Sequence, residues 1–141
     1  MGGANMGSDV DILILNTLVL DLRSEDFAFA DELVGPGGLA KCAAEDMPSY
    51  TQQELQAWID RGCATAGGPG NCAPLMARAG LRAAVGGWLG AGAQDGFDVQ
   101  GREFYDILAA AGVELSAVAT HPSRPTGTTF IHESPGDERG G

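Results

Sequence analysis

Apolar side chains first occur in one long run near the start of the chain. The stretch 10–22, "VDILILNTLVLDL", is almost entirely apolar, which is typical of a strand that is buried on both faces of a parallel sheet. Asp21 stands near the far end of this run, where a carboxylate is costly unless it has a partner. The pattern therefore predicts a buried first strand with one acidic side chain at its carboxyl end.

Further along, apolar positions recur with the spacing of helices. Thr51 and Glu54 have the separation of a capping box, and Gly62 follows as an end signal. Three apolar side chains of this short helix fall on one face: Leu55, Trp58 and Ile59. The segment before the helix, 35–50, is rich in turn-forming residues and is predicted to be a loop.

The clearest helix is "DVQGREFYDILAAAG", which begins at its cap, Asp98, and ends at Gly112. Its apolar residues recur at i, i+3, i+4 and i+7, as one buried face requires: Phe104, Ile107, Leu108 and Ala111.

A third helix follows the glycine-rich stretch "TAGGPGNCAPLMARAG" at 65–80. Proline is tolerated only in a first helical turn, so this helix starts within a residue or two of Pro74, and Asn71 stands at or just before its N-terminus. Gly80 ends it. The side chains predicted to face inward are Leu75, Met76 and Ala79.

Short strands separate these helices. Predicted strands are "CATA" (63–66), "RAAVGGWL" (82–89), "VELSAVATH" (113–121) and "TGTTFIHES" (126–134), and "SPGDE" (134–138) is a predicted tight turn between hairpin arms. Strands and helices in alternation predict an α/β fold with a mostly parallel sheet flanked by helices.

Composition narrows the partners. The chain has 141 residues, which suits one domain, and its 8 Lys and Arg against 19 Asp and Glu give a net charge of -11. An acidic surface repels phosphate backbones and anionic lipids, so neither nucleic acid nor a membrane is an expected partner. No apolar run reaches the ~18 residues of a membrane span, and no export signal is visible.

Familiar chemical motifs are missing. Cys42, Cys63 and Cys72 form no Cys-x-x-Cys pair, so we expect no metal site and a reducing, cytoplasmic location. Neither a phosphate-binding Walker loop nor a His-Glu-x-x-His motif occurs. We expect structural or surface roles for His121 and His132.

The glycine-rich stretch still has chemical content. Glycines expose backbone N–H groups, which favour polar or anionic oxygens at a helix N-terminus. Asn71 offers a donor and an acceptor, as a sugar hydroxyl requires, and Asp21 can accept two hydroxyl hydrogen bonds. The alternative is that Asn71 only caps its helix and Asp21 only caps a turn.

A dinucleotide site is a further alternative. Gly68, Gly70 and Ala73 fit Gly-x-Gly-x-x-Ala. The acidic residue expected about 20 positions later is absent, because no Asp or Glu occurs between Ala73 and Asp95.

Four segments in order resemble the PfkB/ribokinase-like carbohydrate kinase family. They are "DILILNTLVLD", like its first strand with a substrate-binding Asp, "AGGPGNCAPLMARAGLRAAVG", like its glycine-rich segment ending in Asn, "DVQGREFYDILAAAGVELS", like its Asp-x-x-Gly helix, and "RPTGTTFIHESPGDER", like its Thr-Gly strand and Gly-Glu-Arg turn. The resemblance covers nearly all of the chain except residues 35–62.

The resemblance implies a ribokinase-like, Rossmann-type α/β fold and a sugar or nucleoside substrate. It implies that Asp21 and Asn71 bind sugar hydroxyls, that Gly67 and Gly68 let the backbone approach the sugar, and that Thr129 lines the pocket. It further implies phosphorylation of a sugar hydroxyl by ATP with Mg²⁺, and it allows a homodimer of the complete protein.

The chain departs from the family pattern at several points. Asn16 replaces a usual glycine, Val19 stands where many members have a second Asn, and residues 91–97 lengthen a short connection. Residues 35–62 replace the usual lid hairpin with a loop and a helix. We also expect "GAGAQD" at 90–95 to be a loop.

The largest departure concerns catalysis. The family's Gly-Ala-Gly-Asp motif, with the catalytic base and the adenine pocket, belongs to a C-terminal half that this chain does not resemble. Residues 1–141 are therefore identified as an N-terminal substrate-binding portion, without catalytic residues and inactive alone. Alternatives are a non-catalytic sugar- or nucleoside-binding module and an NAD-binding oxidoreductase domain.

Overall fold

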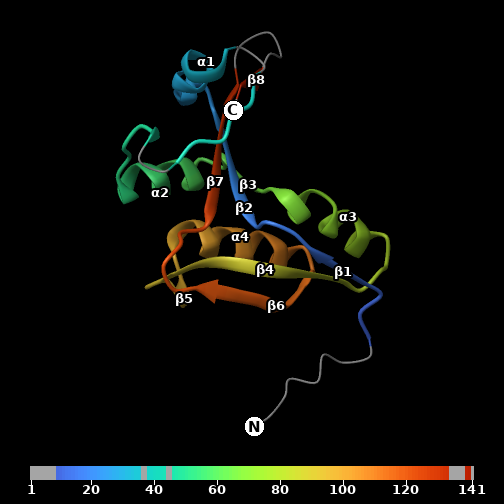
Figure 1. The fold of residues 1–141 in the computed structure, drawn as a ribbon. Coiled ribbons are helices and arrows are strands. Elements are labelled where there is room, and N and C mark those ends of the chain that lie inside the picture. Colours follow the sequence, from blue (N-terminus) through green and yellow to red (C-terminus); the bar gives the residue numbers. More distant parts are fainter. Residues whose placement is uncertain (1–8, 36–37, 44–45, 134–138, 141) are drawn as a thin grey trace. The chain divides into compact units, whose positions relative to one another are not determined.

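The computed structural model describes residues 9–35, 38–43, 46–133 and 139–140. The chain divides into two compact units, which are described separately (Figure 1). Unit 1 comprises Met1–Leu20 and Thr65–Gly127, and unit 2 comprises Asp21–Ala64 and Thr128–Gly141. None of the helices in the described part is long and apolar enough to span a bilayer.

Unit 1 contains the parallel sheet that the alternation of strands and helices predicted. Its central strand is β4 (Ala83–Gly92), which pairs in parallel with β1 (Ile12–Leu15) on one side and with β6 (Glu114–His121) on the other. The α/β fold class is thereby confirmed.

Helices cover one face of this sheet. The 3-10 turn η3 (Gly68–Asn71) leads into α3 (Ala73–Arg78), and α4 (Val99–Ala110) follows β4; both helices lie on the same side of the strands (Figure 1). The core between sheet and helices is fully buried and includes Val85, Leu89, Phe104 and Leu108.

The opposite face of the sheet carries exposed apolar side chains. The Leu15 side chain lies over Gly86, and Trp88 is two residues farther along the same strand. Leu13, Leu15 and Trp88 are 40%, 70% and 62% exposed. The prediction that the first strand is buried on both faces is therefore wrong for the described chain.

The first apolar run is two strands and not one. β1 ends at Leu15, and β2 (Val19–Ser24) belongs to a different sheet. Between them the Asn16 carboxamide accepts a hydrogen bond from the Thr17 N–H at 2.7 Å. Such a local bond offers the backbone an alternative to strand pairing, which hydrophobicity alone does not reveal.

Two glycines make room for the segment between β1 and β2. A Cβ at Gly68 would lie 2.5 Å from the Thr17 carbonyl oxygen, and a Cβ at Gly87 would lie 2.8 Å from the Asn16 carbonyl oxygen. Both glycines have positive φ, 56° and 155°. The segment 16–17 thus fits against backbone that cannot carry side chains.

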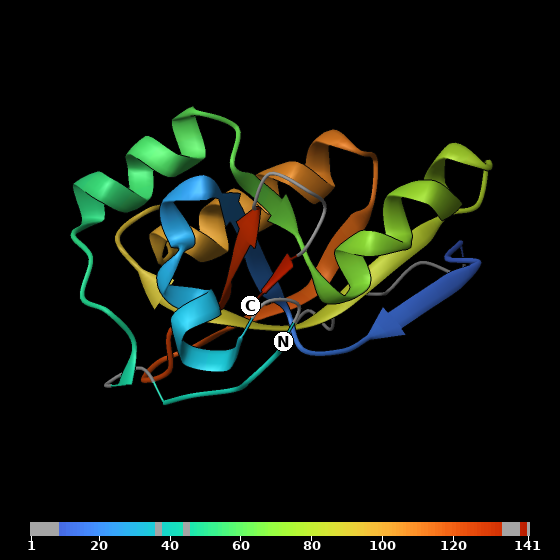
Figure 2. The ribbon, with the colours of Figure 1, turned by 90° about the horizontal axis from the view of Figure 1, so that it is seen from above.

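Most residues of the second sheet, whose strand order is β3-β2-β7-β8, belong to unit 2. β3 is Ala64–Ala66, β7 is Gly127–Glu133 and β8 is Arg139–Gly140, and β7 and β8 pair antiparallel as hairpin arms. β2 lies next to β7 (Figure 2). The predicted turn "SPGDE" lies outside the described residues.

The helix of unit 2 that the sequence predicted is α2 (Gln52–Asp60). Its capping box is complete, because Thr51 N–H donates to Glu54 at 2.7 Å and Glu54 N–H donates to the Thr51 hydroxyl at 3.1 Å. Gly62 follows with a φ of 77°. The described part of 35–62 is a loop followed by a helix, as predicted.

Two short elements of unit 2 were not predicted: η1 (Glu25–Phe27) and α1 (Phe29–Val34). Phe27 is fully buried and makes edge-on contacts with Trp58 and Phe130, with ring centroids 4.9 and 5.1 Å apart. Because these contacts join distant segments, no local pattern announces them.

Two predictions of local structure in unit 1 are wrong. Leu75 is 59% exposed and Ala79 is also exposed, whereas Ala73 is fully buried, so the six-residue α3 presents a different face to the core. The loop predicted for residues 90–95 is partly a hairpin, because β4 continues to Gly92 and pairs with β5 (Gly96–Phe97).

A hydrogen-bond network ties the end of β4 to α4 and to the start of β7. The Asp98 carboxylate accepts hydrogen bonds from Gly101 N–H at 2.7 Å, and from the Thr126 hydroxyl and N–H at 2.6 and 2.7 Å. The Thr126 hydroxyl in turn accepts one from Gly90 N–H at 2.8 Å. A Cβ at Gly90 would overlap the Asp98 carboxylate, so these four residues form one closely fitted cap.

We predict that Gly68→Ala destabilises the chain more than Gly80→Ala. Both glycines have positive φ, 56° and 90°, so both substitutions strain the backbone by about 1–2 kcal/mol. Only Gly68 faces a backbone oxygen, whereas a Cβ at Gly80 meets nothing within 4 Å. Urea denaturation should give an additional loss of about 1–3 kcal/mol for Gly68→Ala, and equal losses would contradict the close packing of the Thr17 carbonyl against Gly68.

Candidate functional site

Two predicted site residues of unit 2 lie together. Asp21 is the third residue of β2 and Thr129 is the third residue of β7, its neighbour in the sheet. The Thr129 hydroxyl donates a hydrogen bond to the Asp21 carboxylate. Asp21 is thus in the middle of a strand and not at a carboxyl end, as the sequence predicted, because β2 is a separate strand.

The two faces of β2 differ sharply. Leu20 and Leu22 are fully buried, whereas Asp21 is half-buried. Since successive side chains of a strand point to opposite faces, Asp21 and Arg23 share the other face. The interpretation that Asp21 only caps a turn is therefore wrong.

Burial raises the pKa of the Asp21 carboxyl above its ordinary value, while the Thr129 hydrogen bond and the Arg23 guanidinium act in the opposite direction. A carboxylate that is partly withdrawn from water gains from each further hydrogen-bond donor. The hydroxyl groups of a ligand are such donors.

The other three predicted residues belong to unit 1. Gly67 is buried and its N–H donates to the Val19 carbonyl oxygen at 2.8 Å, while Gly68 opens the turn η3. Asn71 is the last residue of η3 and is exposed. The N-cap of α3 is Cys72, without a side-chain cap, so the alternative that Asn71 only caps this helix is also wrong.

The structure explains why two positions of the glycine-rich stretch are glycine without reference to a ligand. Gly68 accommodates the Thr17 carbonyl, and a Cβ at Gly70 would overlap the Ala66 side chain. The chain's own packing therefore explains these two positions. The contact of Gly67 and Gly68 with a sugar stays a prediction, as does a shared site for Asp21 and Asn71.

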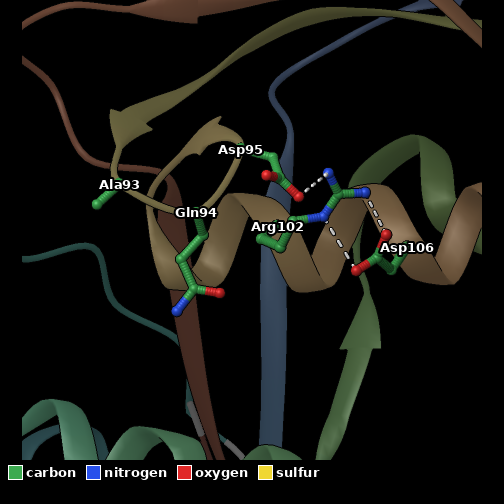
Figure 3. A pocket seen from close by; sticks show the side chains of 5 residues that line it. All are labelled: Ala93, Gln94, Asp95, Arg102 and Asp106. Carbon is green, nitrogen blue, oxygen red and sulfur yellow. Dashed lines mark hydrogen bonds and ion pairs between the residues drawn. The ribbon is translucent and has the colours of Figure 1, made fainter.

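A hollow of unit 1 lies away from the predicted residues. It has a volume of about 680 Å³ and is lined by Ala93, Gln94, Asp95, Arg102 and Asp106 (Figure 3). The Arg102 guanidinium pairs with both acidic side chains of this set and lies over the Tyr105 ring at 4.7 Å. Because the Arg102 guanidinium is already paired, we interpret its ion pairs as structural contacts between the hairpin and α4.

Both histidines have the structural roles that were predicted. The His121 Nδ1 accepts hydrogen bonds from the N–H groups of Ser123 and Arg124 at 3.2 and 3.0 Å, and the His132 Nδ1 lies 2.5 Å from the Asp31 carboxylate. No group of three or more potential metal ligands occurs within the described ranges.

Comparison with known proteins places the fold. No model of a known protein family and no curated protein matches the chain. Solved structures do match. The adenosine kinase from Sinorhizobium meliloti is 21% identical with a TM-score of 0.62, over 94% of this chain and 38% of that one.

Two sugar kinases match similarly. A probable sugar kinase from Rhizobium etli CFN 42 is 24% identical with a TM-score of 0.58, over 94% of this chain and 37% of its own. The fructokinase from Xylella fastidiosa with bound ATP is 20% identical with a TM-score of 0.50, over 86% of this chain and 29% of its own.

The chain therefore has the fold of the sugar and adenosine kinases, as its resemblance to PfkB/ribokinase-like proteins predicted. It spans about a third of the length of these enzymes.

We predict that Asp21→Asn stabilises the chain at neutral pH. Because the pKa of Asp21 is raised in the folded state, the native protein holds this proton more tightly than the unfolded chain. Stability is therefore lost as pH rises from the ordinary Asp pKa of about 3.9 to the raised value, and it stays lower above it. Asparagine can still accept the Thr129 hydrogen bond.

The free energy of unfolding is measured in urea at pH 7 and near pH 3. It should be larger for Asp21→Asn than for the unaltered chain only at pH 7. Asp60→Asn, on the exposed surface of α2, is the matched control and should change little at either pH. A less stable Asp21→Asn protein at pH 7 would contradict the argument.

Proposed function

We propose that this chain supplies the sugar-binding part of an ATP-dependent carbohydrate kinase that phosphorylates a hydroxyl of a sugar or nucleoside. One observation carries the proposal: kinases of this kind match the fold over about nine tenths of the chain. The position predicted from the motifs for substrate contact, Asp21, is a half-buried carboxylate with a hydroxyl partner.

In this proposal each site residue has a distinct task. Asp21 accepts hydrogen bonds from two sugar hydroxyls, and Thr129 fixes the orientation of its carboxylate. Asn71 offers a donor and an acceptor to a further hydroxyl, and the backbone of Gly67 and Gly68 passes close to the sugar ring. These contacts orient the hydroxyl that is to react.

The chain itself is proposed to have no catalytic residue. ATP with Mg²⁺ supplies the phosphoryl group, and one similar structure is a fructokinase with bound ATP. In phosphoryl transfer most catalysis comes from positioning and charge stabilisation, so a substrate-orienting part contributes to catalysis without a base of its own. The base belongs to a further part of the complete enzyme.

Exposed apolar side chains on the unit 1 sheet support the proposal that the complete enzyme is larger than this chain. Parallel sheets are covered on both faces, and the exposed apolar side chains on β1 and β4 fit a further packed layer. We further propose that residues 35–62 act as part of a lid over the sugar. A cytoplasmic location and a homodimer of the complete protein complete the proposal.

A non-catalytic sugar- or nucleoside-binding module is the second candidate, because the same polar residues could hold a sugar without phosphoryl transfer. An NAD-binding domain has no comparable support. Gly68 and Gly70, which suggested it, face the chain's own atoms.

We predict that the chain binds a neutral or charged sugar and that Asp21→Ala weakens this binding at least tenfold. The reason is the loss of two hydrogen bonds to a charged acceptor. Isothermal titration with a panel of pentoses, hexoses, their acids and phosphates, and adenosine measures it. Asp60→Ala in the same unit should bind as the unaltered chain does.

An Asp21→Ala variant that binds every ligand of the panel as tightly as the unaltered chain would refute the assignment of the site. A phosphoryl-transfer assay with ATP and Mg²⁺ separates the two candidates. The chain alone should show no turnover, and a complete enzyme that binds sugar but never phosphorylates it would favour the binding module.

A further inference from the structure

Arg23 differs from three other arginines of the structure. Arg61, Arg82 and Arg102 each form salt bridges with aspartates on the surface of the molecule. Arg23 forms no such bridge with any residue that the structure describes, and its Nε atom is enclosed without a hydrogen-bond partner. In an acidic chain with few cations, such a placement needs a reason.

The cost of this arrangement is considerable. A buried donor without a partner costs about 1–3 kcal/mol, and more when the group is charged. Native proteins leave few such atoms, so each one calls for an explanation. Among the described residues only one other buried side-chain atom lacks a partner, the Asp31 Oδ1, and the second oxygen of that carboxylate is held by His132.

The position of Arg23 supplies a reason. It is two residues after Asp21 on β2, so the two side chains share the polar face of this strand. The Arg23 charge is felt at the Asp21 carboxylate, which also receives the Thr129 hydroxyl. The polar face of β2 thus carries a hydroxyl-accepting carboxylate and, beside it, a half-buried guanidinium.

We propose that Arg23 selects an anionic sugar: the ligand that Asp21 holds by its hydroxyls carries a carboxylate or phosphate that pairs with the half-buried Arg23 guanidinium. A guanidinium presents its donors as a planar fork that matches two oxygens of such an anion. Neutral sugars satisfy the Asp21 acceptor but offer no charged group to the Arg23 guanidinium. This inference rests on the proposed function, because it assumes that Asp21 binds sugar.

Charge balance favours the same ligand. Asp21 and Arg23 together are neutral, so the local face does not repel an anion as the rest of this surface, with a net charge of -11, would. An anionic group on the ligand pairs with the positive charge of the half-buried guanidinium. The carboxylate of a sugar acid and the ester of a sugar phosphate share this chemistry.

The test is a titration of the full chain with matched ligands. Glucose, gluconate, glucuronate and glucose 6-phosphate form one series, and ribose and ribose 5-phosphate form another; acetate and inorganic phosphate report binding of the anion alone. We expect at least one acid or phosphate to bind roughly tenfold more tightly than its neutral parent, which is about 1.4 kcal/mol. Carboxylate and phosphate arms identify which anion is preferred.

Two variants assign the preference to Arg23. Arg23→Gln should bring the anionic ligands down to the affinity of the neutral parent while leaving the parent's own affinity within about twofold. Arg23→Lys keeps the charge but loses the Nε–H and the fork, and should retain only part of the preference. Arg78→Gln, which removes an exposed arginine whose Nε bonds only its own helix, should change nothing.

The outcomes separate this inference from the proposed function. Tight binding of a neutral sugar with no preference for its acid or phosphate would overturn the role of Arg23 and leave the sugar site intact. An anion preference that persists in Arg23→Gln would overturn it as well. Binding of no sugar of either class would overturn both proposals, and circular dichroism of each variant excludes unfolding as the cause.

Discussion

The break between β1 and β2 at Asn16 and Thr17 is the constraint on which the rest of this chain depends. β1 has four residues, and the Asn16 carboxamide then bonds the next N–H. The carbonyls of these two residues fit against Gly68 and Gly87, whose missing side chains leave the space for them. After this break, β2 pairs in a second sheet and carries Asp21 with it.

That rerouting gives Asp21 its chemical character. In the second sheet its neighbours are Thr129 on β7 and Arg23 on its own strand. Burial disfavours the carboxylate charge, while a hydroxyl and a guanidinium support it. A protein keeps such a group in a strand at a cost in stability, and that cost is understandable when the group binds a ligand.

The cores of the two units are packed in different ways. Unit 1 buries Val85 and Leu89 of its sheet under α3 and α4, and it fixes the start of α4 through the Asp98 and Thr126 network. Unit 2 packs Phe27 edge-on against the rings of Trp58 and Phe130. In both units, polar side chains such as Asp98 and Asp21 are therefore held by helices and strands that pack against a buried core.

By itself the sequence determined the features that depend on nearby residues. The capping box at Thr51, the cap at Asp98 and the ends at Gly62 and Gly112 are local hydrogen bonds and backbone conformations, so they could be predicted. The alternation of strands and helices also predicted the α/β class, and the order of four motifs predicted the kinase fold.

Only the tertiary structure decided which distant segments meet. It divided the run at 10–22 between two sheets, joined Asp21 to Thr129 and packed Phe27 against Phe130. It also left Leu75 exposed, because the orientation of a six-residue helix depends on its neighbours more than on its own pattern. The physical reason is the same in each case: burial and pairing are set by partners far away in the chain, which no local spacing specifies.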